Sequence, residues 1–302
     1  MSSAVRLIEV GPRDGLQNEK TPISTQSKIE FINRLLDAGL QEIEVTSFVS
    51  PKWVPQLGDA VELISSLPQN RGAKFSALVP NQKGLERALE TGIDRIALFT
   101  AASEAFTKKN INATIAESLA NFREVITAFR NEHPNGFVRG YVSTVIECPY
   151  EGRVAPDQVK PVVMELAQMG VNEICLGETI GVAVPAEVEA LAHVLEDSIN
   201  VEMIAWHFHD TRGTAIANVE AMWRRGYRSF DASAGGLGGC PYAKGATGNV
   251  ATEDVWYLCH SQGLSTGVDL DKLVAASNFI LQKVQKETPS KFLRAYLNTG
   301  KL

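Results

Sequence analysis

The sequence is poor in the features that mark secreted, membrane-spanning or nucleic-acid-binding proteins. Its four cysteines, Cys148, Cys175, Cys240 and Cys259, include no CxxC pair, so neither a disulfide framework nor a zinc knuckle is indicated. No apolar run approaches the length of a membrane span. The net charge is -6 and no run of Lys or Arg is present, which disfavours nucleic acid and membranes as partners. A strand predicted from Val5 leaves no room for a targeting peptide, and we expect a cytoplasmic protein.

What the chain does contain is one pattern that recurs along its length. An amphipathic helix is followed by a glycine, about three further residues and a β-prone run, and the glycine is Gly39, Gly92, Gly170 or Gly226 in the clearest copies. Glycine just beyond a helix ends it by adopting a positive φ at low cost. Strands that alternate with helices in this way predict parallel pairing through crossover helices.

The β-prone runs are numerous enough to close a barrel. They lie at 5–10, 42–46, 74–79, 95–99, 138–145, 173–176, 204–208 and 229–231. No glycine-marked dinucleotide-binding turn follows the first of them, which favours a TIM (β/α)8 barrel over an open doubly wound sheet. No low-complexity linker divides the chain. We therefore predict one α/β domain over 1–302, with the barrel at about 5–265 and an additional C-terminal helix at about 269–286.

His207 and His209 are the most informative pair of residues. Residues two apart in a strand point to the same face, so the two imidazoles are spaced to hold one metal ion. Two core histidines with hydrogen-bonded ring nitrogens are the alternative. Because the carboxyl ends of barrel strands carry the chemistry, we favour metal ligation. Together with Asp14 and Asn249 they form a mixed oxygen and nitrogen set, which suits Mg²⁺ or Mn²⁺.

Charged residues accompany the first two predicted strands. Arg13 and Asp14 directly follow the first strand, between Pro12 and Gly15. A surface ion pair is the alternative, but at this place the pair faces the barrel mouth, where an arginine can stabilise an enolate or a carboxylate. Glu44 lies in the middle of the second strand, where an unpaired charge is costly. Contact with substrate and pairing with Arg13 are both open for Glu44.

A glycine-rich segment, GGLGGCP at 235–241, follows the last strand and contains Cys240. It lacks the order of glycines and the Gly-Lys-Ser/Thr ending that mark phosphate-binding loops. A buried structural role is the usual one for a free cysteine, and we expect it for Cys148 and Cys259. Glycines on both sides of Cys240 favour a flexible loop in which this thiol has a catalytic or gating role.

Taken together, these residues resemble the 3-hydroxy-3-methylglutaryl-CoA (HMG-CoA) lyase family over nearly the whole chain. The matching stretches are VGPRDGLQNE at 10–19, IEVTSFVSPKWVP at 43–55, KKNIN at 108–112, GGCPYA at 238–243 and GN at 248–249. The resemblance implies a TIM-barrel lyase that depends on a divalent cation and cleaves HMG-CoA into acetyl-CoA and acetoacetate by retro-Claisen chemistry.

The resemblance also implies residue roles and partners. The substrate is an acyl-CoA, and barrel lyases of this kind are often homodimers. The metal ligands are Asp14, His207, His209 and Asn249, for Mg²⁺ or Mn²⁺. The implied catalytic residues are Arg13, which stabilises the enolate, Glu44, which supports Arg13 and the substrate, and Cys240, which takes part in proton transfer. Our own hypothesis adds Asp14 as a catalytic residue, because a group near both metal and hydroxyl can help to move the hydroxyl proton.

Two departures from the family pattern concern the substrate. The family usually reads SLGDTIG after the sixth strand, where this chain has CLGETIG with Glu178 and Thr179. It usually reads HDTYG after the seventh strand, where this chain has Arg212 in place of tyrosine. We expect these three residues, together with Arg13 and Ser47, to contact the substrate. The predicted substrate is HMG-CoA or a closely related 3-hydroxy-3-substituted acyl-CoA.

Two other functions are compatible with parts of the pattern. Acyl-CoA condensing synthases of the isopropylmalate or homocitrate type share the R-D-G and HxHD elements, but they usually carry a further C-terminal regulatory region for which 302 residues leave no space. A non-catalytic barrel that serves as a binding module is expected to lack a ligand or the cysteine, and neither is missing here.

Overall fold

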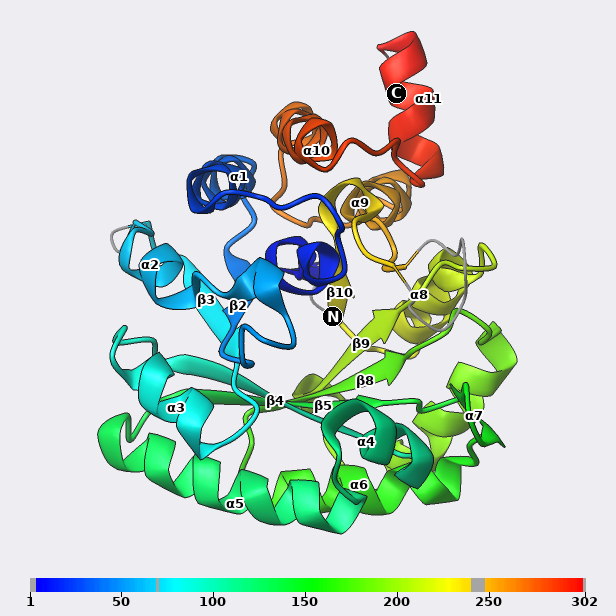
Figure 1. The fold of residues 1–302 in the computed structure, drawn as a ribbon. Coiled ribbons are helices and arrows are strands. Elements are labelled where there is room, and N and C mark those ends of the chain that lie inside the picture. Colours follow the sequence, from blue (N-terminus) through cyan, green and yellow to red (C-terminus); the bar gives the residue numbers. More distant parts are fainter. Residues whose placement is uncertain (1–3, 69–70, 240–247, 301–302) are drawn as a thin grey trace.

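The computed structural model describes residues 4–68, 71–239 and 248–300. Within these ranges, eight parallel strands close into a barrel in which neighbouring strands follow the order of the chain (Figure 1). They are β1 (Arg6–Glu9), β2 (Glu42–Ser47), β3 (Lys74–Leu78), β4 (Arg95–Ala101), β5 (Phe137–Ser143), β8 (Glu173–Glu178), β9 (Ile204–Phe208) and β10 (Ser229–Ala232). Each coincides with a predicted β-prone run, and the predicted TIM barrel is confirmed.

Eight helices connect or follow the strands and cover the outside of the barrel (Figure 1). They are α1 (Thr25–Asp37), α2 (Ala60–Ser65), α3 (Gln82–Leu89), α5 (Ile115–Glu132), α6 (Pro156–Gln168), α7 (Pro185–Glu196), α8 (Ala215–Arg224) and α9 (Thr252–Ser261). Two further elements lie in the connections, α4 (Glu104–Ile111) before α5 and the short hairpin of β6 (Glu147–Cys148) with β7 (Gly152–Arg153).

The C-terminal region forms two helices rather than the one that was predicted. The expected helix is α10 (Leu270–Val284), which packs on α1. A second helix, α11 (Lys291–Thr299), packs on α9 (Figure 1). The helix begins at Ser290, whose side chain caps its start, and it buries Leu293 fully. Phe292 stacks on Tyr257 of α9, and Tyr296 donates to Asp271 of α10 at 2.6 Å, so the helix completes the C-terminal layer.

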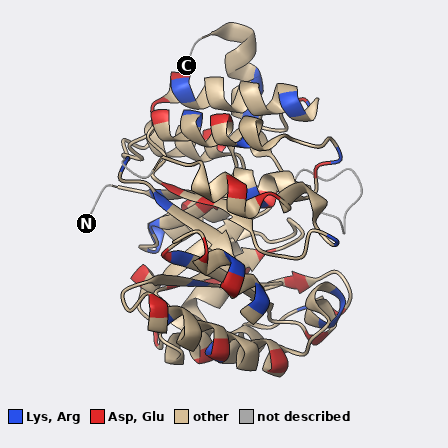
Figure 2. Ribbon diagram, turned by 60° about the vertical axis from the view of Figure 1, so that its left-hand side comes forward, with Lys and Arg blue, Asp and Glu red and all other residues tan. Residues whose placement is uncertain are grey.

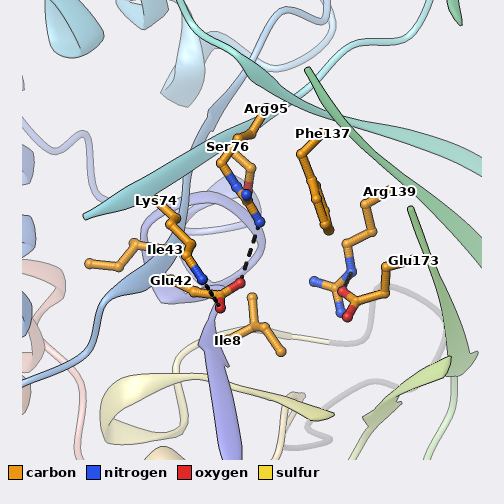
Figure 3. A pocket seen from close by; sticks show the side chains of 9 residues that line it. All are labelled: Ile8, Glu42, Ile43, Lys74, Ser76, Arg95, Phe137, Arg139 and Glu173. Carbon is orange, nitrogen blue, oxygen red and sulfur yellow. Dashed lines mark hydrogen bonds and ion pairs between the residues drawn. The ribbon is translucent and has the colours of Figure 1, made fainter. Parts of the chain in front are cut away.

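The barrel interior has an apolar layer above a charged one. Large apolar side chains pack between the strands and the outer helices, and a smaller cluster of Leu78, Ala97, Tyr141, Cys175 and Ala205 lies inside the barrel. Below this cluster, at the amino-terminal ends of the strands, charged side chains surround a small cavity (Figure 3). Lys74 and Arg6 reach solvent at this end of the barrel. Glu42, Arg139 and Glu173 are buried, however, and buried charges must be paired.

The pairing of these interior charges is extensive. Glu42 accepts from Lys74 at 3.0 Å and from Arg6 at 3.0 Å, and it lies 3.4 Å from Arg95. Beside them, Arg139 Nε lies 3.0 Å from a carboxylate oxygen of Glu173 (Figure 3). On the outer helices, acidic and basic residues are interspersed (Figure 2). In the described part of the chain, no helix has both the length and the apolar character needed to cross a membrane.

Candidate active site and metal centre

Arg13 and Asp14 are placed by a single turn of π-helix, Gly11–Gly15, at the carboxyl end of β1. The amides of Asp14 and Gly15 both donate to the carbonyl of Val10, at 2.8 and 3.1 Å, which closes the wide turn. A Cβ at Gly11 would lie 2.5 Å from a carboxylate oxygen of Glu9, so a side chain here would displace that carboxylate from the Gly11 and Ala234 amides. Such single turns are frequent at functional sites, and this one directs Arg13 and Asp14 into the barrel mouth.

Arg13 is buried, with 6% of its surface exposed, and it is held by charged groups on two sides. Its Nε is ion-paired with Glu44 Oε1, and its Nη1 lies 2.6 Å from Asp14 Oδ1. Tyr141 donates from its hydroxyl to the other oxygen of Glu44 at 3.0 Å, and its ring lies under the guanidinium. Burial opposes charge, but the carboxylates of Glu44 and Asp14 outweigh it and raise the pKa of Arg13. A fixed cation therefore stands at the mouth of the barrel.

Asp14, His207 and His209 form a group that fits a metal ion. Each offers a ligand atom, and these atoms all lie within 4.8 Å of one another. Asn249, the fourth predicted ligand, lies beside this group, and its amide nitrogen donates to Asp14 Oδ2 at 2.9 Å. Two buried polar atoms, Asn249 Oδ1 and His209 Nδ1, have no partner in good hydrogen-bond geometry among the described residues. Buried polar atoms without partners are costly, and a hard divalent cation would satisfy them. The residues predicted as ligands are thus brought together.

The pKa shifts of Asp14 and His209 favour the deprotonated forms that bind a cation, whereas the hydrogen bond to Asp231 and the nearby carboxylates outweigh burial and raise the pKa of His207. Burial and the neighbouring His207 lower the pKa of His209 to about 4, so its imidazole is neutral near pH 7. Burial would raise the pKa of Asp14, but Arg13 and the two histidines lower it below its usual range. Metal ligands must be deprotonated, and both groups meet this condition without a large proton cost.

Three interior residues that sequence reasoning missed support the site. Asp231 in β10 accepts from Arg139 Nη2 at 2.5 Å and lies 3.1 Å from His207 Nδ1. Arg139 and Tyr141, both in β5, are joined by a 3.1 Å hydrogen bond from Arg139 Nη1 to the Tyr141 hydroxyl. A signal was present, because Asp231 and Arg139 are charged residues inside β-prone runs, as Glu44 is. The argument applied to Glu44 would have identified them.

Glu178 and Arg212, the two departures from the family pattern, hold the same loop. Glu178 at the end of β8 is 1% exposed, and its Oε1 accepts from the amide of Val182 at 3.0 Å. Arg212 Nη1 donates to the carbonyls of Ile180 and Gly181 at 3.0 and 3.2 Å. In the loop after β8, Glu178 therefore binds a backbone amide and Arg212 binds two backbone carbonyls. Together they determine the position of this loop.

Thr179 and Ser47 also contact protein groups at the barrel mouth. The Thr179 hydroxyl accepts from the amide of Thr144 at 2.8 Å, and the Ser47 hydroxyl accepts from the amide of Val49 at 3.1 Å. These contacts orient Ser47 at the end of β2 and Thr179 directly after β8. Cys240, the predicted catalytic thiol, lies outside the described residues.

The segment that leads toward Cys240 is anchored by two buried carboxylates. Glu253 accepts from the amide of Gly235 at 2.9 and 3.0 Å, and Glu9 accepts from the amide of Ala234 at 2.9 Å and from that of Gly11 at 2.8 Å. Burial raises the pKa of Glu253 to about 8 and that of Glu9 to about 7. Glu9 thus ties the turn that carries Arg13 to the root of the glycine-rich loop.

The fold and this site are typical of a barrel enzyme with its chemistry at the mouth of the barrel. Two imidazoles and a carboxylate converge at the carboxyl end of the strands, beside a buried arginine, and this is the end at which TIM barrels do their chemistry. The family follows from direct comparison. A family model described as HMGL-like matches residues 4–280, and the chain belongs to that family.

Individual relatives agree with this assignment. The chain is 49% identical over 291 residues to the rat protein named 3-hydroxy-3-methylglutaryl-CoA lyase, cytoplasmic, covering 96% of this chain and 84% of the relative. It is 50% identical over 293 residues to a Pseudomonas aeruginosa protein named 3-hydroxy-3-isohexenylglutaryl-CoA/hydroxy-methylglutaryl-CoA lyase, covering 97% of both. The resemblance stated from the sequence is confirmed.

Solved structures show the same barrel. The crystal structure of hydroxymethylglutaryl-CoA lyase from Pseudomonas aeruginosa matches with a TM-score of 0.95 at 49% identity and covers 99% of both chains. An HMG-CoA lyase from Acinetobacter baumannii, solved with coenzyme A and 3-methylmalate, matches with a TM-score of 0.93 at 37% identity and covers 100% of this chain and 98% of that one.

Proposed function

We propose that the protein is a divalent-metal-dependent carbon–carbon lyase that cleaves HMG-CoA, or a closely related 3-hydroxy-3-substituted acyl-CoA, to acetyl-CoA and a 3-keto acid. The observation that carries the proposal is the convergence of Asp14, His207 and His209 beside Arg13. The family adds support because its members in rat and Pseudomonas aeruginosa are named for this cleavage. Mg²⁺ or Mn²⁺ is the proposed cation, because the ligands are oxygen and nitrogen without thiolate.

The reaction breaks the bond between C2 and C3 of the acyl chain. The hydroxyl on C3 loses its proton and becomes a ketone, while the electron pair of the broken bond stays on C2 as a thioester enolate. A bound divalent cation would make that hydroxyl more acidic. Asp14, His207, His209 and Asn249 would hold the cation.

Arg13 and Glu44 serve the second half of the reaction. The guanidinium of Arg13 is buried and permanently charged, so it stabilises the enolate oxygen without first having to reorganise. Glu44, which is bound by both Arg13 and Tyr141, holds that guanidinium in place. Placement of this kind lets an arginine favour the transition state over the bound substrate.

Two protons have to move. The pKa of Asp14 is lowered, so its carboxylate does not retain a proton near pH 7. We therefore propose that Asp14 accepts the hydroxyl proton and passes it on to solvent. Cys240 is proposed as the acid that protonates C2 of the enolate. This role rests on the family motif, because Cys240 lies outside the described residues.

The loop after β8 is the proposed wall for the substituent on C3. Glu178 and Arg212 hold this loop from its two sides, and both differ from the usual family residues. The Pseudomonas aeruginosa relative is named for both isohexenylglutaryl and methylglutaryl substrates. The question to test is therefore which sizes of C3 substituent this loop accepts. Thr179 and Ser47 are proposed substrate contacts at the same mouth.

The test is release of acetyl-CoA by purified protein from HMG-CoA and from analogues with longer C3 substituents, with and without Mg²⁺ or Mn²⁺. We expect metal-dependent release that is lost in His207→Ala. Release from a longer-chain analogue but not from HMG-CoA would support the lyase mechanism and identify the analogue as the better substrate. No release from any of them, with metal bound, would overturn the lyase proposal and favour the condensing direction.

Compartment, assembly and domain organisation are proposed as well. The cytoplasm is supported by three buried free cysteines, Cys148, Cys175 and Cys259, and by the name of the rat relative, and cell fractionation tests it. A homodimer and a single domain over 1–302 complete the proposal. Light scattering after size-exclusion chromatography measures the first, and a single cooperative unfolding transition would support the second.

A further inference from the structure

Asp231 connects a metal-ligating histidine to the charged floor of the barrel. It lies in β10 directly beside His207 of β9 in the strand register, so both side chains point into the barrel. Asp231 is 2% exposed. Its Oδ1 accepts from Arg139 Nη2 at 2.5 Å, and its Oδ2 lies 3.1 Å from His207 Nδ1. Each oxygen of this carboxylate thus has a different charged or titratable partner.

The contact with Asp231 determines which nitrogen of His207 carries the proton. Arginine is always protonated in proteins, so Arg139 keeps Asp231 ionised, and an ionised carboxylate can only accept hydrogen bonds. His207 Nδ1 must therefore be the donor. In a neutral imidazole the other nitrogen, Nε2, then has a free lone pair, which is the form that binds a metal. That nitrogen lies on the ring edge away from Asp231.

Arg139 is itself fixed from below. Its Nε lies 3.0 Å from Glu173 at the barrel floor (Figure 3). Its Nη1 donates to the Tyr141 hydroxyl at 3.1 Å. All its contacts are to buried groups on three different strands. Glu173 and Tyr141 therefore hold the guanidinium of Arg139 in place, and this guanidinium orients the carboxylate of Asp231. The chain Glu173, Arg139, Asp231, His207 runs from the floor of the barrel to its mouth.

We propose that Asp231, supported by Arg139, is a positioning residue that holds His207 with its proton on Nδ1 and its Nε2 lone pair directed toward the cation. The proposal rests on the proposed metal-dependent function. A carboxylate behind a ligating histidine fixes both ring orientation and tautomer, and the loss of such partners typically weakens metal binding roughly 10- to 100-fold.

Asp231→Asn tests the proposal with almost no change in shape. Arg139 has only donors, so it will bind the amide oxygen and leave the amide NH₂ facing His207. An NH₂ group can only donate, so Nδ1 of His207 must then accept and the proton moves to Nε2. We expect the His207 tautomer to invert and the dissociation constant for Mn²⁺ to rise roughly 10- to 100-fold.

Two measurements are made on each protein without substrate. Nitrogen-15 NMR of the metal-free protein reports the tautomer, and the five histidines of the chain keep the spectrum simple enough to assign with His207→Gln. Titration with Mn²⁺ followed by electron paramagnetic resonance reports affinity. Cys175→Ser is the matched control, because this thiol touches the same Asp231 oxygen at 3.4 Å but carries no charge. It should leave both readouts unchanged.

Each outcome decides between the possible roles. Inverted tautomer and weaker Mn²⁺ binding in Asp231→Asn, with Cys175→Ser unchanged, support the proposal. A wild-type His207 with its proton on Nε2 overturns it even if the variant fails to fold. Equal Mn²⁺ affinity in wild type and a folded Asp231→Asn also overturns it. Failure of the wild type to bind Mn²⁺ or Mg²⁺ contradicts the metal-dependent function instead, and the NMR result still shows whether Asp231 sets the tautomer.

Discussion

Arg13 and Glu44 form a buried ion pair that joins the turn after β1 to the middle of β2. Burying two charges is costly unless further contacts satisfy them, and here Asp14 binds the guanidinium while Tyr141 binds the carboxylate. Burial of these charges lowers the stability of the fold, but it fixes the orientation of the Arg13 guanidinium. That is the property required of a group that stabilises charge only as the charge develops.

Glu44→Gln should lower kcat for HMG-CoA cleavage roughly 100-fold, which is the scale at which misplacing an electrostatic group acts. The isosteric amide keeps the volume but removes the charge that orients Arg13. Steady-state kinetics at saturating metal measure the effect. Glu42→Gln is the control, since Glu42 lies on the same inward face of β2 but pairs with Lys74 and Arg6 at the floor. Equal loss in both variants would mean that Glu44 acts through stability alone.

Asn249→Ala should raise the dissociation constant for Mn²⁺ roughly 10-fold, and excess metal should restore much of the activity. The reason is the unpartnered Oδ1 of Asn249, which the substitution removes together with the donor to Asp14. Isothermal titration calorimetry gives the affinity. Asn218→Ala is matched to it, because Asn218 is also buried with an unpartnered Oδ1 but binds the carbonyl of Ala183 in the outer layer. An unchanged affinity in Asn249→Ala would remove Asn249 from the ligand set.

Arg212→Tyr and Glu178→Asp, made together, should change the ratio of kcat/KM for HMG-CoA to that for a longer-chain analogue by roughly 10-fold or more, while metal affinity stays constant. A factor of this size is the discrimination expected from reshaping a pocket wall by about one methylene. Arg225→Tyr serves as the control, since Arg225 pairs with Glu196 away from the mouth. A constant ratio would show that the loop after β8 does not select the substituent.

The stability of the protein should fall as pH rises from about 5 to about 8, and Glu253→Gln should flatten that decline. Burial raises the pKa of Glu253 from 4.5 to about 8. Between these values the folded protein keeps a proton that the unfolded chain has lost, so the stabilisation present below pH 4.5 is lost as pH passes 8. The contribution is on the order of a few kcal/mol.

Urea denaturation at several pH values measures this linkage. Glu9, with a pKa of about 7, shifts in the same direction, so Glu253→Gln should remove only part of the slope. Glu220→Gln is the surface control, because Glu220 pairs with Arg224 on the solvent face of α8, and it should keep the wild-type slope. A slope in Glu253→Gln equal to that of the wild type would assign the pH dependence to other groups.

Much of this molecule could be predicted from local pattern. The eight strands, their alternation with helices and the closed barrel follow from periodicity, and the helix-ending glycines do have positive φ, 96° at Gly39 and 104° at Gly226. The convergence of His207 and His209 with Asp14 was predictable too, because every parallel strand in a barrel delivers its carboxyl end to the same face.

Other features depend on how distant segments meet. Arg139 and Asp231 are 92 residues apart, and Tyr141 and Glu44 are 97 apart. Their identities as charged or polar residues in strands were visible, but their partners were not. The same holds for Glu178 and Arg212, which were expected to face substrate and which bind opposite sides of one loop.

The difference has a physical cause. Side-chain periodicity and glycine placement act within a few residues, so the order of residues along the chain is enough to specify the type of each element, the barrel and the end of the barrel where the chemistry lies. Which inward-facing charges become partners depends on the stagger of all eight strands around the closed barrel, and that stagger is settled by packing of the whole core. The proposed metal ligands belong to the first category, and the network of Asp231 and Arg139 behind them belongs to the second.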